Sequence, residues 1–210
     1  MIPNFTVEST CGTINFHQAI EGYSAVLITH PGAFTPVCTT ELGKLQEYMQ
    51  EFERRGVRLF SLTTSSLEDL NMWLRDIEAV TGYRPSYPLM ADPDKSVCRQ
   101  LGVLETLPGG AGEQASRTVM FIGPDKKLKI EIVYPGSVGR STSEIFRVLD
   151  AMKLTMTYPV AIPCAWKPGD EVVISPKLSD QEVREKFPDH RVVELPSGKN
   201  YLKFAPSPAV

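Results

Sequence analysis

Residues 30–43 read HPGAFTPVCTTELG, and this stretch joins a buried strand to a helix. The apolar run at residues 25–29 has the length of a strand, and the sequence His-Pro-Gly ends it. Beyond the stretch, apolar residues spaced three or four apart predict one face of a helix that continues to Arg55. Pro36 suits a first helical turn, because its missing N–H would have no partner there. The sequence therefore predicts a strand, a loop and a helix, with Cys38 in the first turn of that helix.

Cys38 lies where the backbone is expected to favour a negative charge. The first N–H groups of a helix lack partners within the helix and carry partial positive charge. A thiolate, the nucleophilic form of cysteine, is favoured at such a place, and Arg117 or Arg140 could add a cation from elsewhere in the fold. Strand–loop–helix junctions are also the usual place for function in α/β sheets. Local physics alone leaves Cys38 evenly balanced between a reactive thiol and a small buried hydrophobe.

The other cysteines give no second chemical signal. Cys11, Cys98 and Cys164 lie far apart and form no C-x-x-C pair, which does not indicate a disulfide framework. The three histidines are scattered, so no zinc or other metal site is expected. No secretory or other targeting segment is visible at the N-terminus, and we therefore expect mostly free thiols and a cytoplasmic location.

Composition is typical of a globular protein. The chain has 210 residues, of which 42% are hydrophobic and 22% charged, which suits one domain with a small appendage. The net charge of -3 gives no reason to expect nucleic acid or an anionic membrane as a partner. The apolar runs are too short to span a bilayer.

The remaining pattern predicts an α/β fold followed by a different kind of segment. Strand patterns at residues 57–62, 118–122 and 128–133 accompany helical patterns after Ser66 and at residues 143–154. This alternation predicts a sheet with helices on both faces. Eight of the 17 prolines follow Tyr158. We therefore divide the chain into a main domain, residues 1–158, and a C-terminal extension, residues 159–210.

The motif P-x-x-x-T-x-x-C from Pro31 to Cys38 resembles the active-site signature of the peroxiredoxins, and residues 30–43 are similar to the one-cysteine subfamily. The similarity covers nearly the whole chain and continues at residues 116–129, 134–140, 144–148, 159–166 and 195–202. The resemblance implies a thioredoxin-like fold with a small C-terminal extension domain. It also implies a homodimer supported by that extension, with a larger assembly left open.

The resemblance implies a thiol-dependent peroxidase in antioxidant defence and redox homeostasis. Hydrogen peroxide and organic hydroperoxides would be reduced to water or alcohols through a sulfenic acid at Cys38, without a metal or organic cofactor. In this interpretation Thr35 orients the peroxide, Pro31 shields the site from water, and Arg117 polarises the thiolate and the developing charge. The positions expected around the pocket are His30, Glu41 and Arg140.

Two-cysteine members of the family carry a resolving cysteine in their C-terminal part. Here no cysteine follows Cys164, so we expect an external thiol or other reductant to regenerate the enzyme. Cys98 or Cys164 as a resolving thiol is kept as the alternative. A sulfenic acid without a resolving thiol is exposed to further oxidation.

Three other functions are weighed against the peroxidase. A thiol–disulfide oxidoreductase would need a second cysteine at position 41, where the chain has glutamate. A lipase activity of mammalian one-cysteine members, with a G-x-S-x-G-like motif, would need serine where Tyr23 stands, and Ser24 is one residue out of register. By the same resemblance, His17 and Asp125 match the histidine and the acidic residue of that activity. A peroxide sensor or chaperone-like assembly, in which oxidised Cys38 acts as a signal, is compatible with the same residues.

Overall fold

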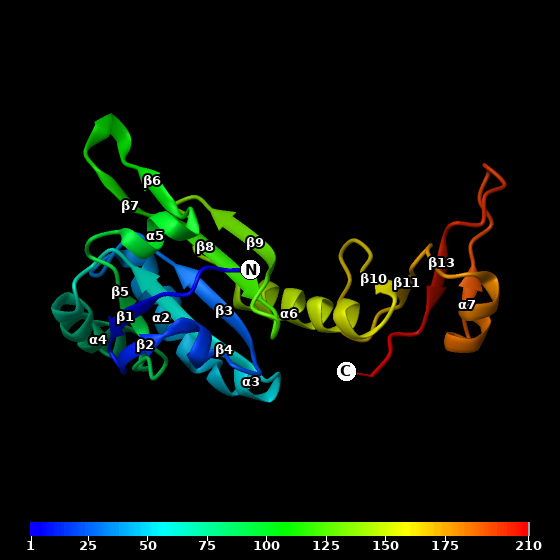
Figure 1. Cartoon of the computed structure of the whole chain (residues 1–210), viewed down its shortest axis with the longest axis horizontal. Helices are drawn as coiled ribbons and strands as arrows, with labels where there is room; N and C mark the ends of the chain where they lie inside the picture. The colour runs from blue at the N-terminus through cyan, green and yellow to red at the C-terminus, as the bar shows by residue number, and fades with distance from the viewer. Residues whose placement is uncertain (210) are drawn as a thin grey trace. The chain divides into compact units, whose positions relative to one another are not determined.

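The computed structural model describes residues 1–209, and its contacts divide the chain into two compact units, Met1–Thr142 and a second unit from Ser143 onward (Figure 1). The strands of the first unit are β1 (Thr6–Ser9), β2 (Gly12–Asn15), β3 (Ser24–Thr29), β4 (Val57–Thr63), β5 (Leu89–Ala91), β6 (Leu104–Thr106), β7 (Glu113–Ala115), β8 (Arg117–Ile122) and β9 (Leu128–Tyr134). Its helices are α1 (Phe16–Ala19), α2 (Pro36–Glu47), α3 (Met49–Arg54), α4 (Leu67–Thr81) and α5 (Ser96–Leu101), with a 3-10 turn η1 at Pro108–Gly110.

Seven of these strands form one mixed sheet in the order β2-β1-β5-β4-β3-β8-β9. Strands β3, β4 and β5 run parallel to one another, whereas β8 pairs antiparallel with β3. β6 and β7 form a separate hairpin that extends away from this sheet (Figure 1). The predicted α/β class and strand positions 57–62, 118–122 and 128–133 are thus confirmed.

β3 lies inside the sheet, between β4 and β8, and its residues from Ala25 to Thr29 are all buried. Its side chains alternate between the two faces of the sheet. Leu27 belongs to a buried cluster on one face that also contains Phe16 of α1, Phe60 of β4 and Val97 of α5. His30, one residue beyond β3, contacts Trp73 of α4 from the opposite face. The chain that leaves the end of β3 therefore lies between the sheet and helix α4.

Helix α2 begins as the sequence predicts, with Pro36 in its first turn. The predicted single helix to Arg55 is instead two helices, because Tyr48 leaves helical geometry at φ -101° and ψ 16°. No glycine or proline stands at this break, so the apolar spacing continues through it unchanged. Helix α4 also begins where expected, since the Ser66 hydroxyl accepts a hydrogen bond from Asp69 N at 3.1 Å.

The C-terminal unit contains helix α6 (Thr142–Thr157), β10 (Val160–Ala161), β11 (Val172–Ile174), helix α7 (Asp180–Lys186), β12 (Arg191–Val192) and β13 (Lys203–Ala205). Its four strands pair in the order β10-β11-β13-β12. Trp166 and Val183 lie in its buried apolar cluster. Ser179 and Glu182 form a capping box that starts α7. Contacts group α6 with this unit, whereas the sequence analysis assigned that helix to residues 1–158.

No helix among residues 1–209 is both long enough and apolar enough to cross a membrane.

Candidate active site

Cys38 lies in the first turn of α2, and its side chain is fully buried, with an exposed fraction of 0%. Thr35 precedes the helix with extended backbone angles, φ -103° and ψ 137°, and Pro36 follows it. The sulfur is therefore fixed by the backbone at the positive end of the α2 dipole. This is the position that the sequence predicted for it.

Arg117 contacts Cys38 from the first residue of β8. Its Nη1 donates a hydrogen bond to Sγ of Cys38 at 3.4 Å, and the same nitrogen also bonds Glu41. Its Nη2 donates to the carbonyl oxygen of Gly136 at 2.8 Å. Arg117 is itself buried, with an exposed fraction of 2%. These contacts hold the guanidinium plane beside the sulfur.

Arg140 approaches the same carboxylate from the loop after β9. Its Nε lies 2.9 Å from Oε1 of Glu41 and its Nη2 lies 2.8 Å from Oε2, which is a bidentate arrangement. Its backbone N–H donates to Oε1 of Glu41 as well, at 2.6 Å. Nη1 of Arg140 donates to the carbonyls of Thr29 and Thr118, at 2.8 and 3.0 Å. Glu41 therefore joins two arginines that come from different parts of the chain.

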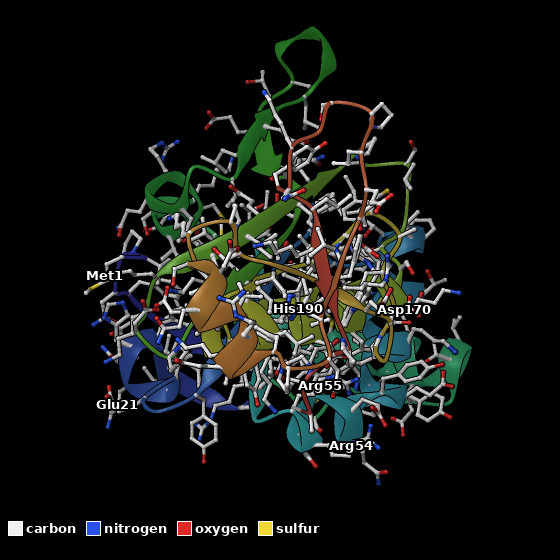
Figure 2. All side chains as sticks on the ribbon, turned by 90° about the vertical axis from the view of Figure 1, so that its right-hand side faces the viewer. Met1, Glu21, Arg54, Arg55, Asp170 and His190 are labelled. Carbon is white, nitrogen blue, oxygen red and sulfur yellow. The ribbon has the colours of Figure 1, made fainter. Side chains whose placement is uncertain are left out.

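The buried cluster has an uneven charge. Arg117 and Arg140 carry two positive charges and Glu41 carries one negative charge, so one positive charge is left beside Cys38. A thiolate at Cys38 would make the cluster neutral, and burial makes such a balance important. Many other charged side chains lie at the surface, such as Glu21 and Arg54 (Figure 2), whereas Asp92 is buried elsewhere in the unit.

His30 is buried beside this cluster as a neutral ring. Burial first, and then the charges of Arg140 and Arg117, lower the pKa of His30 from 6.5 to about 3. Neither ring nitrogen has a hydrogen-bond partner, although the backbone N–H donates to the carbonyl of Leu62 at 3.2 Å. A protonated His30 would add a further positive charge to a site that already has an excess.

The loop before α2 carries the remaining predicted residues. The Thr35 hydroxyl donates to the carbonyl oxygen of Gly32 at 2.8 Å and makes no capping bond to α2. Pro31 is half-buried at the start of this loop. The structure thus brings Cys38, Arg117, Glu41, Arg140 and His30 together, and it places Thr35 and Pro31 on the segment that enters the site.

Trp73 makes a polar contact near the site that the sequence pattern did not predict. Its position on the apolar face of the predicted helix indicated a core residue, and it is indeed buried. Its indole Nε1 also donates to the hydroxyl of Thr39 at 3.0 Å. The polar end of Trp73 therefore reaches the helix turn that carries Cys38, which no spacing in the sequence could reveal.

The other cysteines lie in different settings. Cys98 is buried in α5, where burial and the carboxylate of Asp92 raise the pKa of its thiol. Its backbone N–H donates to Asp92 Oδ2 at 2.7 Å. Cys11 and Cys164 are exposed, and all four cysteines are free thiols. In the described part of the chain, no three His, Cys, Asp or Glu side chains gather as metal ligands.

The residues weighed for a lipase make other contacts. The Tyr23 ring lies under the guanidinium of Arg58, 4.1 Å from its carbon. Asp125 pairs with Lys129 at 2.7 Å. The His17 Nε2 lies 2.9 Å from the carbonyl oxygen of Ile2. These contacts do not join into a hydrolytic triad.

His30 generates a prediction about stability. Its folded pKa, about 3, lies below its ordinary value of 6.5, so between these values the unfolded chain takes up a proton that the folded chain does not. The stability associated with the neutral ring is present above pH 6.5 and is lost as the pH falls toward 3. Between pH 7 and pH 5 the loss amounts to about 2 kcal/mol.

Urea unfolding of the wild type and of His30→Phe at several pH values measures this loss. We expect the stability difference between the two proteins to shift in favour of the variant by about 2 kcal/mol from pH 7 to pH 5. Equal pH dependence in both would contradict the assignment of a neutral buried ring.

Comparison with known proteins agrees with this geometry. Residues 1–130 match the AhpC/TSA family, and residues 151–190 match the C-terminal domain of 1-Cys peroxiredoxin. The chain is 42% identical to 1-Cys peroxiredoxin A of Oryza sativa subsp. japonica, over 97% of this chain and 94% of that protein. It is 41% identical to Peroxiredoxin-6 of Mus musculus, over 98% of this chain and 95% of that protein.

Two solved structures are similar over nearly the full length. Peroxiredoxin 6 of Arenicola marina, crystallised as a mutant, has a TM-score of 0.93 and 39% identity, covering 100% of this chain and 97% of that one. A yeast mitochondrial 1-Cys peroxiredoxin has a TM-score of 0.88 and 33% identity, covering 98% and 96%. The thioredoxin-like fold and the C-terminal extension are therefore shown, and the chain belongs to the peroxiredoxins of the AhpC/TSA family, as a thiol-dependent peroxidase of the 1-Cys group.

Proposed function

We propose that Cys38 is the sulfur that reduces the hydroperoxide. Its thiolate attacks the terminal peroxide oxygen, an S–O bond forms, and the O–O bond breaks. The departing oxygen takes up a proton and leaves as water or an alcohol, while Cys38 becomes a sulfenic acid. The observation that carries this proposal is the 3.4 Å contact between Sγ of Cys38 and Nη1 of Arg117.

Arg117 would act in both stages of this step. Before reaction, its charge stabilises the thiolate at the start of α2. During reaction, negative charge moves from sulfur to the departing oxygen, and a fixed guanidinium beside the sulfur can stabilise that charge without reorganising. The bonds from Arg117 to Glu41 and Gly136 support this role, because they fix the plane before the peroxide arrives.

The other site residues would act through position and charge. Thr35 orients the peroxide through its hydroxyl, which would exchange its bond to Gly32 for one to the substrate. Pro31 limits the access of water from the preceding loop. Glu41 and Arg140 hold Arg117 in place, and the neutral His30 ring adds no further positive charge beside the cluster.

We infer that an external thiol returns Cys38 to its reduced state. The thiol sulfur attacks the sulfenic sulfur, water leaves, and a mixed disulfide forms that a second thiol reduces. Cys98 is disfavoured as an internal partner, because it is buried and its pKa is raised. The similar yeast mitochondrial protein resolves its thiol through glutathione and thioredoxin systems, which supports the same reductant class here.

Access to Cys38 bears on both stages. Its side chain has no exposed surface, so a peroxide and a reductant thiol would each reach the sulfur only if the segment around it moves.

We also propose that the chain forms a homodimer, and that the C-terminal extension contributes to the dimer interface. The edge strand β9 carries exposed apolar side chains, Leu128 at 41% and Val133 at 64%, which suits pairing with another chain. A cytoplasmic location stays a prediction.

Cysteine variants test the role of Cys38 by steady-state peroxide consumption with dithiothreitol as reductant. Cys38→Ser should abolish consumption of hydrogen peroxide, because serine cannot form the sulfenic acid. Cys11→Ser, Cys98→Ser and Cys164→Ser should each retain it. Full activity in Cys38→Ser would contradict the proposal.

Arg117 is tested by the rate of the oxidation step. Arg117→Met should lower kcat/KM for hydrogen peroxide by about 100-fold or more, because a fixed donor to the developing charge is lost. The kcat/KM of Arg117→Lys should lie between those of the wild type and of Arg117→Met, since lysine keeps the charge without the planar contacts. Arg99→Met is the matched control, because Arg99 is an exposed arginine paired with Glu113. A change of less than twofold in Arg117→Met would oppose the assigned role.

The dimer is tested by light scattering, which should give twice the chain mass of 23.3 kDa. Val133→Lys should weaken association, because it replaces an exposed apolar side chain of the edge strand with a charge. A wild-type monomer would rule out the dimer, and a dimer unaffected by the substitution would move the interface away from β9.

A further inference from the structure

We propose that Gly43 is a positioning residue of the peroxidase site, which lets α2 approach Thr81 of α4 closely and thereby holds Cys38 beside Arg117. The inference rests on the proposed role of Cys38 and concerns how its sulfur is placed for the oxidation step. It assigns a task to a glycine in the middle of a helix that the spacing of apolar residues did not indicate.

Gly43 occupies a helical position at which glycine is unfavourable. In a helix interior glycine is less stable than alanine, because it loses more conformational freedom on folding. Gly43 is nevertheless buried in the middle of α2, and its backbone does not have the positive φ that would require glycine. The reason for a glycine here must therefore lie in the neighbouring helix.

The side chain of Thr81, at the end of α4, lies directly against Gly43. A Cβ atom added at Gly43 would stand 2.5 Å from both Cβ and Cγ2 of Thr81, and nearer still to its Oγ1. Non-bonded carbon atoms pack about 3.5 to 4.0 Å apart, so an alanine at this position would have to displace one helix from the other by roughly 1 Å. The missing side chain of Gly43 therefore sets how closely α2 approaches α4.

Thr81 is held in place by its own hydrogen bonds. Its β-branched side chain has few rotamers available. Its hydroxyl donates to the carbonyl oxygen of Ile77 at 2.7 Å and accepts a hydrogen bond from Tyr83 N at 3.2 Å. Turning this side chain away from Gly43 would break both bonds at the end of α4. We therefore expect α2, rather than Thr81, to move when a methyl group is added at Gly43.

A second contact fixes the same part of α2. The buried Tyr87 hydroxyl donates to the carbonyl oxygen of Leu42 at 2.9 Å. Burial raises the pKa of Tyr87 above its ordinary value, so the hydroxyl stays protonated and remains a donor. Thr81 and Tyr87 therefore contact two consecutive residues of α2, Gly43 and Leu42, which directly follow Glu41.

The arginines of the ion cluster are bonded to elements other than α2. Arg140 donates to carbonyl oxygens of β3 and β8, and Arg117 donates to the carbonyl oxygen of Gly136. Cys38 and Glu41, in contrast, belong to α2 and move with it. Sγ of Cys38 already lies in contact with Nη1 of Arg117, at 3.4 Å, so a displaced α2 can only lengthen this distance.

Two effects on the oxidation step follow from such a displacement. The thiolate would lose part of the positive charge beside it, which moves the midpoint of the pH–rate profile to higher pH. The Arg117 guanidinium would also be misplaced for the charge that develops on the departing oxygen. A misplacement of about 1 Å can lower a rate on the order of 100-fold.

Transfer of a methyl group between the two helices tests the contact. Gly43→Ala adds the clashing Cβ, and Gly43→Ala/Thr81→Gly removes the atoms that this Cβ would meet. Stopped-flow mixing measures the oxidation of Cys38 by hydrogen peroxide over a range of pH. We expect kcat/KM at pH 7 to fall about tenfold or more in Gly43→Ala, with its pH midpoint raised. In the double variant kcat/KM should return to within about threefold of the wild type, with the wild-type midpoint.

Matched controls separate this contact from a general loss of packing or of a threonine. Thr81→Gly alone leaves the space at Gly43 open and should change kcat/KM less than about threefold. Gly43→Ala/Thr157→Gly is the matched double variant, because Thr157 also ends a helix and its hydroxyl also bonds the carbonyl four residues earlier, that of Lys153. This variant should stay as slow as Gly43→Ala. Urea unfolding shows whether each protein is folded under the conditions of the rate measurement.

Wild-type kcat/KM in Gly43→Ala, a slow Gly43→Ala/Thr81→Gly, or equal rescue by Thr157→Gly would overturn the proposal. A loss of rate without a shift of the pH midpoint would also overturn it and leave Gly43 as a packing residue. If Gly43→Ala does not fold, the Thr81→Gly double variant decides, and its failure to fold would count against the proposal. Absence of a sulfenic acid on wild-type Cys38 would overturn this proposal and the proposed function together, whereas a normal sulfenic acid with unchanged variants would overturn this one only.

Discussion

The buried ion cluster of Arg117, Glu41 and Arg140 is the constraint on which the site depends. Its members come from β8, from α2 and from the loop after β9, so the cluster forms only when the sheet, the helix and the loop are in place. Buried charges require partners, and the Glu41 carboxylate serves both arginines. The geometry of the site therefore depends on the fold. A shift of β8 relative to α2 would separate Arg117 from Glu41 and leave a buried charge unpaired.

The positive charge left in that cluster bears on the charge states of the two neighbouring side chains, Cys38 and His30. The proposed thiolate at Cys38 would complete the balance, while a neutral His30 avoids adding to the excess. The first turn of α2 contributes in the same direction through its backbone dipole. Burial by itself disfavours a thiolate, as it does at Cys98, so a thiolate at Cys38 would depend on these neighbouring positive charges.

The sequence predicted the parts of this site that are determined by residues close together in the chain. The apolar run before His30 and the place of Pro36 locate the strand, the loop and the start of the helix, and the structure agrees. Arg117 could be paired with Cys38 only through the family motif, because 79 residues separate them and no local pattern relates their positions. Glu41 could be placed around the pocket only through the family resemblance, since its two arginine partners are set by tertiary packing. The break at Tyr48 and the polar contact of Trp73 left no mark in the apolar spacing, and both depend on neighbours distant in the chain or on backbone geometry alone.

The central claim is that Cys38 becomes a sulfenic acid that awaits an outside thiol. Intact mass after one equivalent of hydrogen peroxide, with dimedone as the trap and Cys38→Ser as the control, tests it most directly. A single dimedone adduct on the wild type that is absent from Cys38→Ser is the expected result. Loss of two hydrogens without an adduct would show that a disulfide forms within the protein, and that result would contradict a cycle with a single catalytic cysteine.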